Sequence, residues 1–528
     1  MSAKTQVILQ ARTGSKRLYG KSVIPIIDEP LVVLCNKRLK YKNFQVTTVI
    51  PKGKEDDYLA HVLKKNRLNF VRGDKFDVLK RFKDFTKNFK KNDIIVRVTA
   101  DNPFVDKNFL IKLIKIYKLK NLEYFSAHDN VKNLPYGIQA EIFRVKHLRE
   151  IKTNKKFVKE HVTPTIRKKY LKKDLNIYLK NYSNLPNLYL SIDTFDDLTR
   201  VKNIFLNYSG SPYSNLFKII KNKKKDKKRK KKDYLSKIIL GTVQIGKKYF
   251  QNKIKISQAR ANNILNTALK NNINFFDTAH DYGNSEKYIG NFKIKNKKEI
   301  FLCSKLKNLN LNKNIKKEDI IKKMNFSIFE SLNRLKSSQI ENFLVHNSQD
   351  LYKSKFVYDH LKKFFNCNII KNIGVSIYNP KELKKIKNFH SVNSVQLPFN
   401  LIDHRWVKTL NKKKKINIFV RSIFLRGNLK KNKITFPNSI RKTNKINEKL
   451  RSFCKKFGKK NLFELTLAYL KSFQGIDHLV IGAQNSDHIK DFKKMIKTQK
   501  LNKKQKNMLI KFIKTNFDAK QADLRNWH

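Results

Sequence analysis

The sequence predicts an α/β protein of two domains, the second of which is a (β/α)8 TIM barrel. The chain has 528 residues, and one domain usually holds about 100 to 200, so more than one core is expected. The stretch KNKKKDKKRKKKD at 221–233 is almost entirely charged and offers no apolar side chain to a core, which is typical of a linker. After it, short apolar runs alternate with segments of helical spacing.

Eight of these apolar runs are short enough to be strands. Most are separated by segments such as SQARANNILNTALKNN (257–272) and KKMNFSIFESLNRLKSS (322–338), in which apolar residues recur three or four positions apart. Eight strand–helix units in about 290 residues match a TIM barrel, whereas a doubly wound sheet usually has fewer strands. The expected strands lie at 237–242, 273–278, 299–305, 341–347, 372–376, 394–397, 416–422 and 478–483.

The net charge is +77, with 118 Lys and Arg residues against 41 Asp and Glu. Such an excess is typical of proteins that bind nucleic acid or an anionic surface. Here lysine is spread over the whole chain, including turns and inter-strand segments, and dispersed charge is mostly a solvated face. We therefore expect no nucleic-acid partner, and keep a charge-driven nucleic-acid-binding protein as the alternative from another functional class.

The cysteines and the apolar segments indicate the cellular compartment of the protein. The four cysteines are far apart and form no CxxC pair, so neither a zinc site nor a disulfide framework is expected. The first residues, MSAKTQVILQAR, lack the long apolar stretch of a signal peptide, and no segment approaches 18 unbroken apolar residues. We expect a cytoplasmic protein without a membrane partner.

Polar residues follow three consecutive expected strands of the barrel. Asp277 ends the second strand, Lys305 the third and His346 the fourth, and Tyr282 lies in the loop after the second. Singly, each has an ordinary explanation as a turn or loop residue. Active sites of TIM barrels lie at the carboxyl ends of the strands, so we expect these four side chains to share one mouth.

Residues 235–528 resemble the aldo/keto reductase family through LGTVQIG, FFDTAHDYGNSE, CSKL, FLVHN, GVS, VQLPFN and VIGAQNSDHI. The resemblance implies an NAD(P)(H)-dependent oxidoreductase that acts on a small carbonyl substrate, with Asp277, Tyr282, Lys305 and His346 as its catalytic residues. Tyr282 would be the general acid, and Lys305, as a nearby cation, would lower its pKa. Asp277 would pair with Lys305, and His346 would align the carbonyl oxygen.

The same resemblance implies a nicotinamide cofactor, NADP or NAD. Ile377 stands where many relatives have Asn, and Gly482 and His488 stand where NADP-preferring members often have Lys and Arg. Either cofactor is therefore expected. The cofactor-binding residues that it implies are Gly241, Thr242, Ser376, Gln396, Ser422, Gly427, Gly482, Ala483 and His488.

The N-terminal region begins with a strand-like run and a loop rich in Gly, Arg and Lys, VILQARTGSKRLYGKSVIPIIDEPLVV. Such loops cradle phosphates, because backbone N–H groups approach the oxygens and fixed cations add charge. Residues 14–22 fit the P-loop pattern formally, but a P-loop passes directly into a helix. Pro25 and Pro30 oppose a long helix, so we expect SVIPIIDEP (22–30) to be extended.

Residues 5 to about 210 resemble the cytidylyltransferases that activate acidic sugars, specifically the spore-coat polysaccharide type. The motifs are the first loop and VRGDKFDVLKRF, IIVRVTADNPFVD, LPYGIQAEIF, EHVTP and LSIDTFDDL. The resemblance implies a Rossmann-like nucleotidyltransferase fold, and CTP and a sugar or sugar acid as substrates. Tyr19 and Lys16 differ from the commonest loop, where Pro and Thr are usual, so nucleotide choice stays slightly open. The implied nucleotide-binding residues are Gln10, Ala11, Arg12, Gly14, Ser15, Arg17, Lys21 and Arg97.

Nucleotidyl transfer needs Mg²⁺ to bridge the triphosphate, and carboxylates at strand ends are suitable ligands. Asp101 follows the apolar run IIVRVT and Asp193 follows LYLSI, so these two are the predicted metal ligands. Turn aspartates are the alternative. Glu141 and His161 are expected to shape the sugar pocket.

Together these patterns predict a cytidylyltransferase-like domain at 1–220, a basic linker at 221–234 and a reductase-like barrel at 235–528. The expected function is a bifunctional enzyme of surface glycan sugar biosynthesis. In the alternative, only the reductase is active and the first domain is a sugar-nucleotide-binding module. The identity of both substrates, the redox direction and the oligomeric state, monomer or homodimer, stay open.

Overall fold

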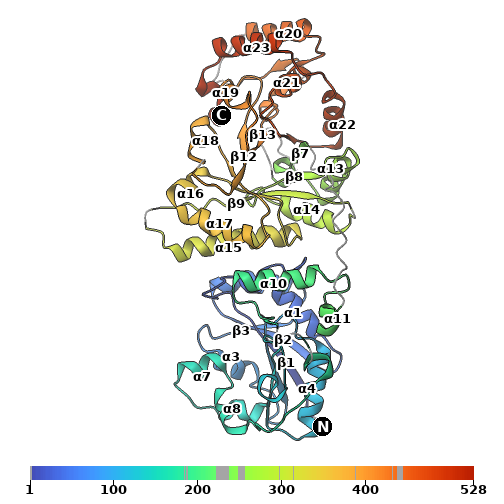
Figure 1. The fold of residues 1–528 in the computed structure, drawn as a ribbon, viewed down its shortest axis with the longest axis vertical. Coiled ribbons are helices and arrows are strands. Elements are labelled where there is room, and N and C mark those ends of the chain that lie inside the picture. The colour runs from blue at the N-terminus through green and yellow to red at the C-terminus, as the bar shows by residue number, and fades with distance from the viewer. Residues whose placement is uncertain are drawn as a thin grey trace. The chain divides into compact units, whose positions relative to one another are not determined.

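The computed structural model describes residues 3–183, 185, 188–221, 237–247, 256–296, 298–312, 314–386, 388–430, 432–436 and 444–527. The chain forms two compact units, residues 1–230 and 231–528, which are shown in Figure 1 and treated separately below. The predicted linker at 221–234 lies outside the described residues except for Lys221.

The first unit is built on a six-stranded sheet of order β3-β2-β1-β4-β6-β5. β1 is central, and its residues Val7, Ile8 and Leu9 are all fully buried, as expected where a sheet is covered on both faces. The four strands β1 to β4 are parallel, and β6 is antiparallel to both β4 and β5. The strands are β1 (Thr5–Gln10), β2 (Gln45–Pro51), β3 (Phe70–Gly73), β4 (Ile94–Thr99), β5 (Tyr124–Ser126) and β6 (Glu141–Arg144).

The helices of this unit begin where the sequence provides caps. Asp77 and Asp106 accept backbone N–H bonds at the starts of α3 and α4, and Thr194 forms a capping box with Asp197 at α10. The helices are α1 (Leu31–Leu39), α2 (Asp57–Lys65), α3 (Val78–Phe85), α4 (Lys107–Leu119), α5 (Ala127–Asn130), α6 (Val145–Glu150), α7 (Lys156–His161), α8 (Pro164–Tyr170), α9 (Lys180–Ser183), α10 (Phe195–Leu206) and α11 (Leu216–Lys221). Short 3-10 turns are η1 (Lys21–Val23) and η2 (Lys54–Asp56).

Two local predictions for this unit are wrong. The segment 22–30 does not begin extended, because Gly20, with φ 79°, turns the chain into η1. The related prediction, that the loop does not pass directly into a long helix as a P-loop would, is confirmed, because α1 begins only at Leu31, after Pro30. The run LYLSI is not a strand either: only Tyr189 forms an isolated bridge, to Tyr136.

The second unit is a closed barrel of eight parallel strands, which confirms the predicted (β/α)8 fold. Its strands run in chain order, and β16 pairs with β7 to close it. Buried side chains that include Phe275, Cys303, Leu344 and Phe419 form its core cluster. The strands are β7 (Ile238–Gly241), β8 (Phe275–Asp277), β9 (Phe301–Leu306), β10 (Asn342–Val345), β11 (Ile373–Ser376), β12 (Val392–Pro398), β13 (Asn417–Arg421) and β16 (His478–Gly482).

Helices surround the barrel strands (Figure 1). Among the described helices, the longest is α15 (Lys317–Leu335), which overlaps the segment 322–338 whose spacing predicts a helix but begins and ends earlier. A small ribbon of β14 (Leu429–Lys430) and β15 (Lys433–Ile434) follows β13, after the turn η3 (Leu425–Gly427). None of the helices in the described ranges combines the length and the apolar character that a membrane crossing requires. The remaining helices are α12 (Val243–Gly246), α13 (Gln258–Lys270), α14 (Ser285–Ile294), α16 (Ser348–Lys353), α17 (Lys355–Asn366), α18 (Pro380–Ile386), α19 (Val407–Leu410), α20 (Asn444–Lys456), α21 (Leu462–Leu470), α22 (Ser486–Met495), α23 (Lys503–Asn516), α24 (Ala519–Ala522) and the 3-10 turn η5 (Leu524–Asn526).

Candidate active sites

The barrel brings together the four polar residues that follow its second, third and fourth strands. Lys305 Nζ lies 2.7 Å from Asp277 Oδ1 and donates a second hydrogen bond, of 2.8 Å, to the carbonyl of Thr278. The same ammonium lies 4.9 Å from the centroid of the Tyr282 ring. The rings of Tyr282 and His346 meet edge to face, with centroids 6.0 Å apart. A phenol, an ammonium, a carboxylate and an imidazole therefore share one mouth.

The loop that carries Tyr282 is fixed by close backbone packing against α12. A Cβ atom on Gly246 would lie 1.8 Å from the carbonyl oxygen of Tyr282, so only glycine fits there. Gly283 has φ 58°, a left-handed conformation that glycine adopts without strain. The N–H of Asn284 donates to the carbonyl of Gly246 at 3.0 Å. The position of the phenol is thus set by residues in LGTVQIG and DYGN.

The electrostatics of this mouth differ from expectation at Tyr282. Burial raises the pKa of Tyr282, and the nearby charges of Lys305 and Arg421 lower it by less, so the net pKa lies above its ordinary value. The prediction that the charge of Lys305 lowers the pKa of Tyr282 is confirmed, but burial has the larger effect and raises the net pKa. Burial lowers the pKa of Lys305, but Asp277 and Tyr282 raise it by more, so the ammonium stays charged. Burial, Lys305 and Arg421 lower the pKa of His346 to about 4, so its imidazole is neutral at pH 7.

Gln396 on β12 has the geometry of a cofactor-binding residue. Its Nε2 donates to Asp277 Oδ1 at 2.9 Å, and its Oε1 is buried without a hydrogen-bond partner within the described part of the chain. A buried acceptor without a donor is unfavourable by about 1–3 kcal/mol, and the N–H of a carboxamide could satisfy it. Ser376 is its register partner on β11 and is equally buried.

The other predicted cofactor residues lie at the ends of β7, β13 and β16. The hydroxyl of Thr242 is less available to a cofactor, because it donates to the carbonyl of Asp277 at 2.8 Å and also contacts the hydroxyl of Ser285. Ser422 and Gly427 have positive φ angles of 58° and 87° in the turn after β13. Gly241 ends β7, Gly482 ends β16 and is followed by the buried Ala483, and His488 lies exposed in the first turn of α22.

In the first unit, Lys21 joins the two predicted metal ligands. Its Nζ lies 2.8 Å from Asp101 Oδ2 and 3.0 Å from Asp193 Oδ1, and it also donates to the carbonyl of Ile192 at 2.9 Å. Arg17 Nη2 lies 3.0 Å from Asp193 Oδ2. Burial raises the pKa of Asp101, but Lys21 lowers it by more, so this carboxylate is ionised. Lys21 thus bridges the two carboxylates, and Arg17 adds a second cation at Asp193.

Two aspartates alone make an incomplete metal site. Nowhere in the described ranges do three or more His, Cys, Asp or Glu side chains group in a way that could hold a metal ion. Mg²⁺ commonly takes one or two carboxylates and completes its shell with substrate phosphates and water. The pair Asp101 and Asp193 therefore fits such an ion only together with a bound nucleotide.

The remaining predicted nucleotide-binding residues do not contact Asp101 or Asp193. Arg97 donates to Gln10 Oε1 at 3.2 and 3.0 Å and pairs with Glu141, so neither Arg97 nor Gln10 is free. Arg12 turns toward Glu160, at 3.2 Å, and not toward the two aspartates. Around Gly14 the space is open, Ala11 is buried, and Ser15 Oγ accepts from the N–H of Leu18 at 3.4 Å.

A cavity of about 250 Å³ lies beside Arg97 and Glu141. His161 is exposed and does not line this cavity, so its role in shaping a sugar pocket stays a prediction. Arg167 lines the cavity and pairs with Asp129, and neither residue was singled out in the sequence. Beside Asp193, the rings of Tyr136 and Tyr189 stack with centroids 4.2 Å apart. The motifs LPYGIQAEIF and LYLSID contain these tyrosines, but their pairing depends on the fold.

Comparison with known proteins assigns a family to each unit. The model of the aldo/keto reductase family matches residues 237–514, and the cytidylyltransferase model matches residues 6–237. The chain belongs to the aldo/keto reductase family, and its N-terminal half is a cytidylyltransferase domain. Both are enzyme families.

Individual relatives match one domain each. An uncharacterized protein of Methanocaldococcus jannaschii is 32% identical over 202 residues, which are 36% of this chain and 78% of that protein. The spore coat polysaccharide biosynthesis protein SpsF of Bacillus subtilis is 28% identical over 214 residues, 38% of this chain and 85% of that protein. A solved aldo-keto reductase of Bacillus halodurans is 19% identical, with a TM-score of 0.43 over 53% of this chain and 92% of that one.

Proposed function

We propose that the chain carries two enzymes of sugar activation. The cytidylyltransferase domain would transfer a cytidylyl group from CTP to a sugar or sugar acid and release pyrophosphate. The aldo/keto reductase domain would reduce a sugar-like carbonyl with NAD(P)H, or oxidise the alcohol in reverse. Because CTP and NAD(P)H are intracellular metabolites, the proposal places the protein in the cytoplasm. The observation that carries the proposal is Lys305 Nζ, held 2.7 Å from Asp277 and against the ring of Tyr282.

In the reductase domain, Lys305 and Asp277 would prepare the phenol of Tyr282 as a proton donor. The carbonyl oxygen gains negative charge as it is reduced, and a positioned general acid accelerates this step by about 10²- to 10⁴-fold. Lys305 stabilises the tyrosinate left after transfer, and Asp277 fixes the ammonium. His346, neutral at pH 7, would donate a hydrogen bond that aligns the carbonyl.

A nicotinamide cofactor would supply the hydride, since no side chain can do so. Its carboxamide would be held by Gln396, whose buried Oε1 lacks a donor within the described residues, and by Ser376 beside it. The backbone after β13 and β16, around Gly427 and Gly482, would hold the rest of the dinucleotide. The absence of Lys and Arg at Gly482 and His488 leaves both NADH and NADPH in the proposal.

In the cytidylyltransferase domain, Lys21 and Arg17 would neutralise the phosphates of CTP, and Asp101 and Asp193 would hold Mg²⁺. The bound ion would stabilise the charge on the leaving pyrophosphate. The cavity beside Glu141 would take the acceptor. The relative in spore coat polysaccharide biosynthesis supports a surface glycan as the destination of the product.

Two assays on the intact protein test the proposal. With CTP, Mg²⁺ and a panel of sugar acids, we expect pyrophosphate release that depends on one acceptor. With NAD(P)H and a panel of sugar aldehydes and small aldehydes, we expect cofactor oxidation at 340 nm. Binding of CTP without pyrophosphate release would instead support a sugar-nucleotide-binding module. Tight RNA binding with a steep salt dependence and neither activity would support the nucleic-acid alternative.

A further inference from the structure

Arg421 is a cation at the barrel mouth that lacks an anionic partner. It is the last residue of β13, and its Nη2 is buried without a hydrogen-bond partner within the described residues. Arg405 shows the usual alternative, since it is paired with Asp403 at 2.7 Å and Asp523 at 3.2 Å. No carboxylate among the described residues forms an ion pair with Arg421. A buried polar atom is costly unless it is hydrogen-bonded, so the Nη2 of this half-buried guanidinium is suited to an acceptor from outside the chain.

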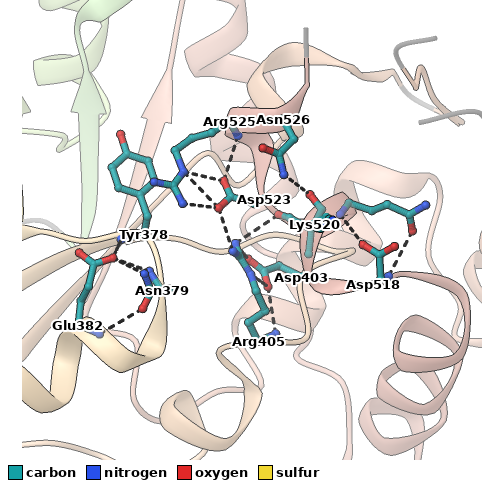
Figure 2. Close-up of polar contacts among 12 residues, drawn as sticks. Tyr378, Asn379, Glu382, Asp403, Arg405, Asp518, Lys520, Asp523, Arg525 and Asn526 are labelled. Atoms are coloured by element: carbon teal, nitrogen blue, oxygen red, sulfur yellow. Dashed lines mark hydrogen bonds and ion pairs between the residues drawn. The ribbon is translucent and has the colours of Figure 1, made fainter. Parts of the chain in front are cut away.

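The guanidinium of Arg421 is held by an aromatic ring and not by a carboxylate. It lies 4.5 Å from the centroid of Tyr378, in the loop after β11. A second guanidinium, that of Arg525, lies 4.4 Å from the same centroid. Figure 2 shows Arg525 beside Tyr378 and hydrogen-bonded to Asp523. Arg525 Nε lies 3.0 Å from Asp523 Oδ1, and its Nη2 lies 2.6 Å from Asp523 Oδ2. Cation–π stacking positions Arg421 while leaving its N–H donors free for another partner.

Arg421 lies close to the groups that would act on the carbonyl. Its charge lowers the pKa of both Tyr282 and His346, which places it within electrostatic reach of each. All three residues lie at the carboxyl ends of barrel strands or in the loops that follow them. The charge of Lys305, in contrast, is balanced by Asp277. Arg421 therefore adds positive charge to the mouth that this ion pair does not neutralise.

We propose that Arg421 binds an anionic group, a carboxylate or a phosphate, on the substrate of the reductase domain. The inference rests on the proposed reductase function and narrows its substrate to anionic carbonyl compounds. The planar guanidinium can donate two parallel N–H bonds to a carboxylate or phosphate. An anionic substrate would satisfy the buried Nη2, whereas a neutral one would leave it unpaired. Arg421 is thus assigned as a specificity-determining residue.

Pairs of aldehydes that differ in one anionic group test the inference. Succinic semialdehyde is compared with butanal, and glyceraldehyde 3-phosphate with glyceraldehyde. The wild-type chain, R421M, R421K and the control R260M are assayed for kcat/KM with NADPH and NADH. Arg260 is an exposed residue of α13, so R260M removes the same charge far from any proposed role.

We expect R421M to lower kcat/KM for the anionic aldehyde of one pair by about 10- to 100-fold, the usual worth of a hydrogen bond to a charged group. The neutral aldehyde should lose much less, because only the effect of Arg421 on the pKa of Tyr282 and His346 applies to it. R421K should retain part of the preference because it keeps the charge. The aldehyde pair whose anionic member loses activity in R421M shows whether the site binds a carboxylate or a phosphate. An equal loss for anionic and neutral aldehydes, or a weakened binding of NAD(P)H, would overturn the inference and assign Arg421 to the cofactor.

A binding measurement separates this inference from the proposed function. Succinate and inorganic phosphate, which carry no aldehyde or ketone group, are titrated calorimetrically into the wild-type chain, R421M and R260M. We expect one of these anions to bind the wild type and R260M alike and to bind R421M at least tenfold more weakly. Equal binding to R421M and the wild type would refute the anion site even if aldehydes are reduced. Arg421-dependent anion binding without reduction of any aldehyde would refute the reductase proposal alone.

Discussion

Replacement of Lys305 by Met removes the charge at the centre of the barrel site. Lys305 is 1% exposed, and its Nζ is bonded to Asp277 Oδ1 at 2.7 Å and to the carbonyl of Thr278 at 2.8 Å. The substitution leaves the carboxylate of Asp277 buried without its cation, although the amide of Gln396 still donates to it at 2.9 Å. Removing one member of a buried ion pair costs about 3–5 kcal/mol. For a domain of this size, that loss lowers Tm by roughly 6 to 10 °C.

The same variant should lose carbonyl reduction, because the tyrosinate of Tyr282 loses the cation that stabilises it. We expect kcat/KM to fall by at least about 100-fold, the lower part of the range for general acid catalysis. The double variant K305M/D277N separates the two effects, since it also removes the unpaired carboxylate. It should regain most of the lost stability in scanning calorimetry of the barrel transition, but not the lost rate.

The exposed Lys307, one residue beyond β9, provides the control K307M, which should change neither Tm nor rate. A K305M variant that reduces carbonyls within about twofold of the wild type would refute the role of Lys305. So would recovery of the rate in the double variant, because the loss would then come from misfolding.

Three further predictions concern other parts of the two sites. K21M should lower pyrophosphate release by about 100-fold or more, because Lys21 would no longer hold Asp101 and Asp193 or offset phosphate charge; an unchanged rate would exclude it from the site. G246A should shift the Tyr282 loop, since the new Cβ would lie 1.8 Å from a carbonyl oxygen, and should lower both Tm and carbonyl reduction; retention of both would contradict the packing. His346, with a pKa of about 4, should show no titration in NMR spectra between pH 5 and 8. Because this pKa is lowered from 6.5 on folding, its contribution to stability is complete above pH 6.5 and is lost as the pH falls toward 4; an imidazole that titrates near 6.5 would contradict its burial.

The barrel could be predicted because local patterns determine it. Each strand is a short apolar run, and a parallel barrel brings all carboxyl ends to one face, so Asp277, Lys305 and His346 could be grouped without coordinates. The net pKa of Tyr282 could not be predicted, since it depends on how completely the fold buries the phenol. The role of Arg421 could not be predicted from the sequence either, because in a lysine- and arginine-rich chain only the fold shows which cation lacks an anionic partner.

The cytidylyltransferase domain shows the same division between local and distant effects. The phosphate loop and the carboxylates could be recognised from their motifs, and Lys21 joins Asp101 to Asp193 across 80 and 172 residues of sequence. The pairing of Arg97 with Glu141 arises from antiparallel strands β4 and β6, in which these two residues are register partners. No pattern within either motif specifies that register, so the sequence alone could not show that Arg97 pairs with Glu141 and lines the neighbouring cavity.

The central claim, two separate catalytic sites on one chain, is tested most directly by assaying two variants for both activities. D101A should lose Mg²⁺-dependent pyrophosphate release and oxidise NAD(P)H with a carbonyl substrate at the wild-type rate. Y282F should lose carbonyl reduction, bind the nicotinamide cofactor with unchanged affinity and release pyrophosphate at the wild-type rate. Loss of both activities in either variant, or of neither, would contradict the account.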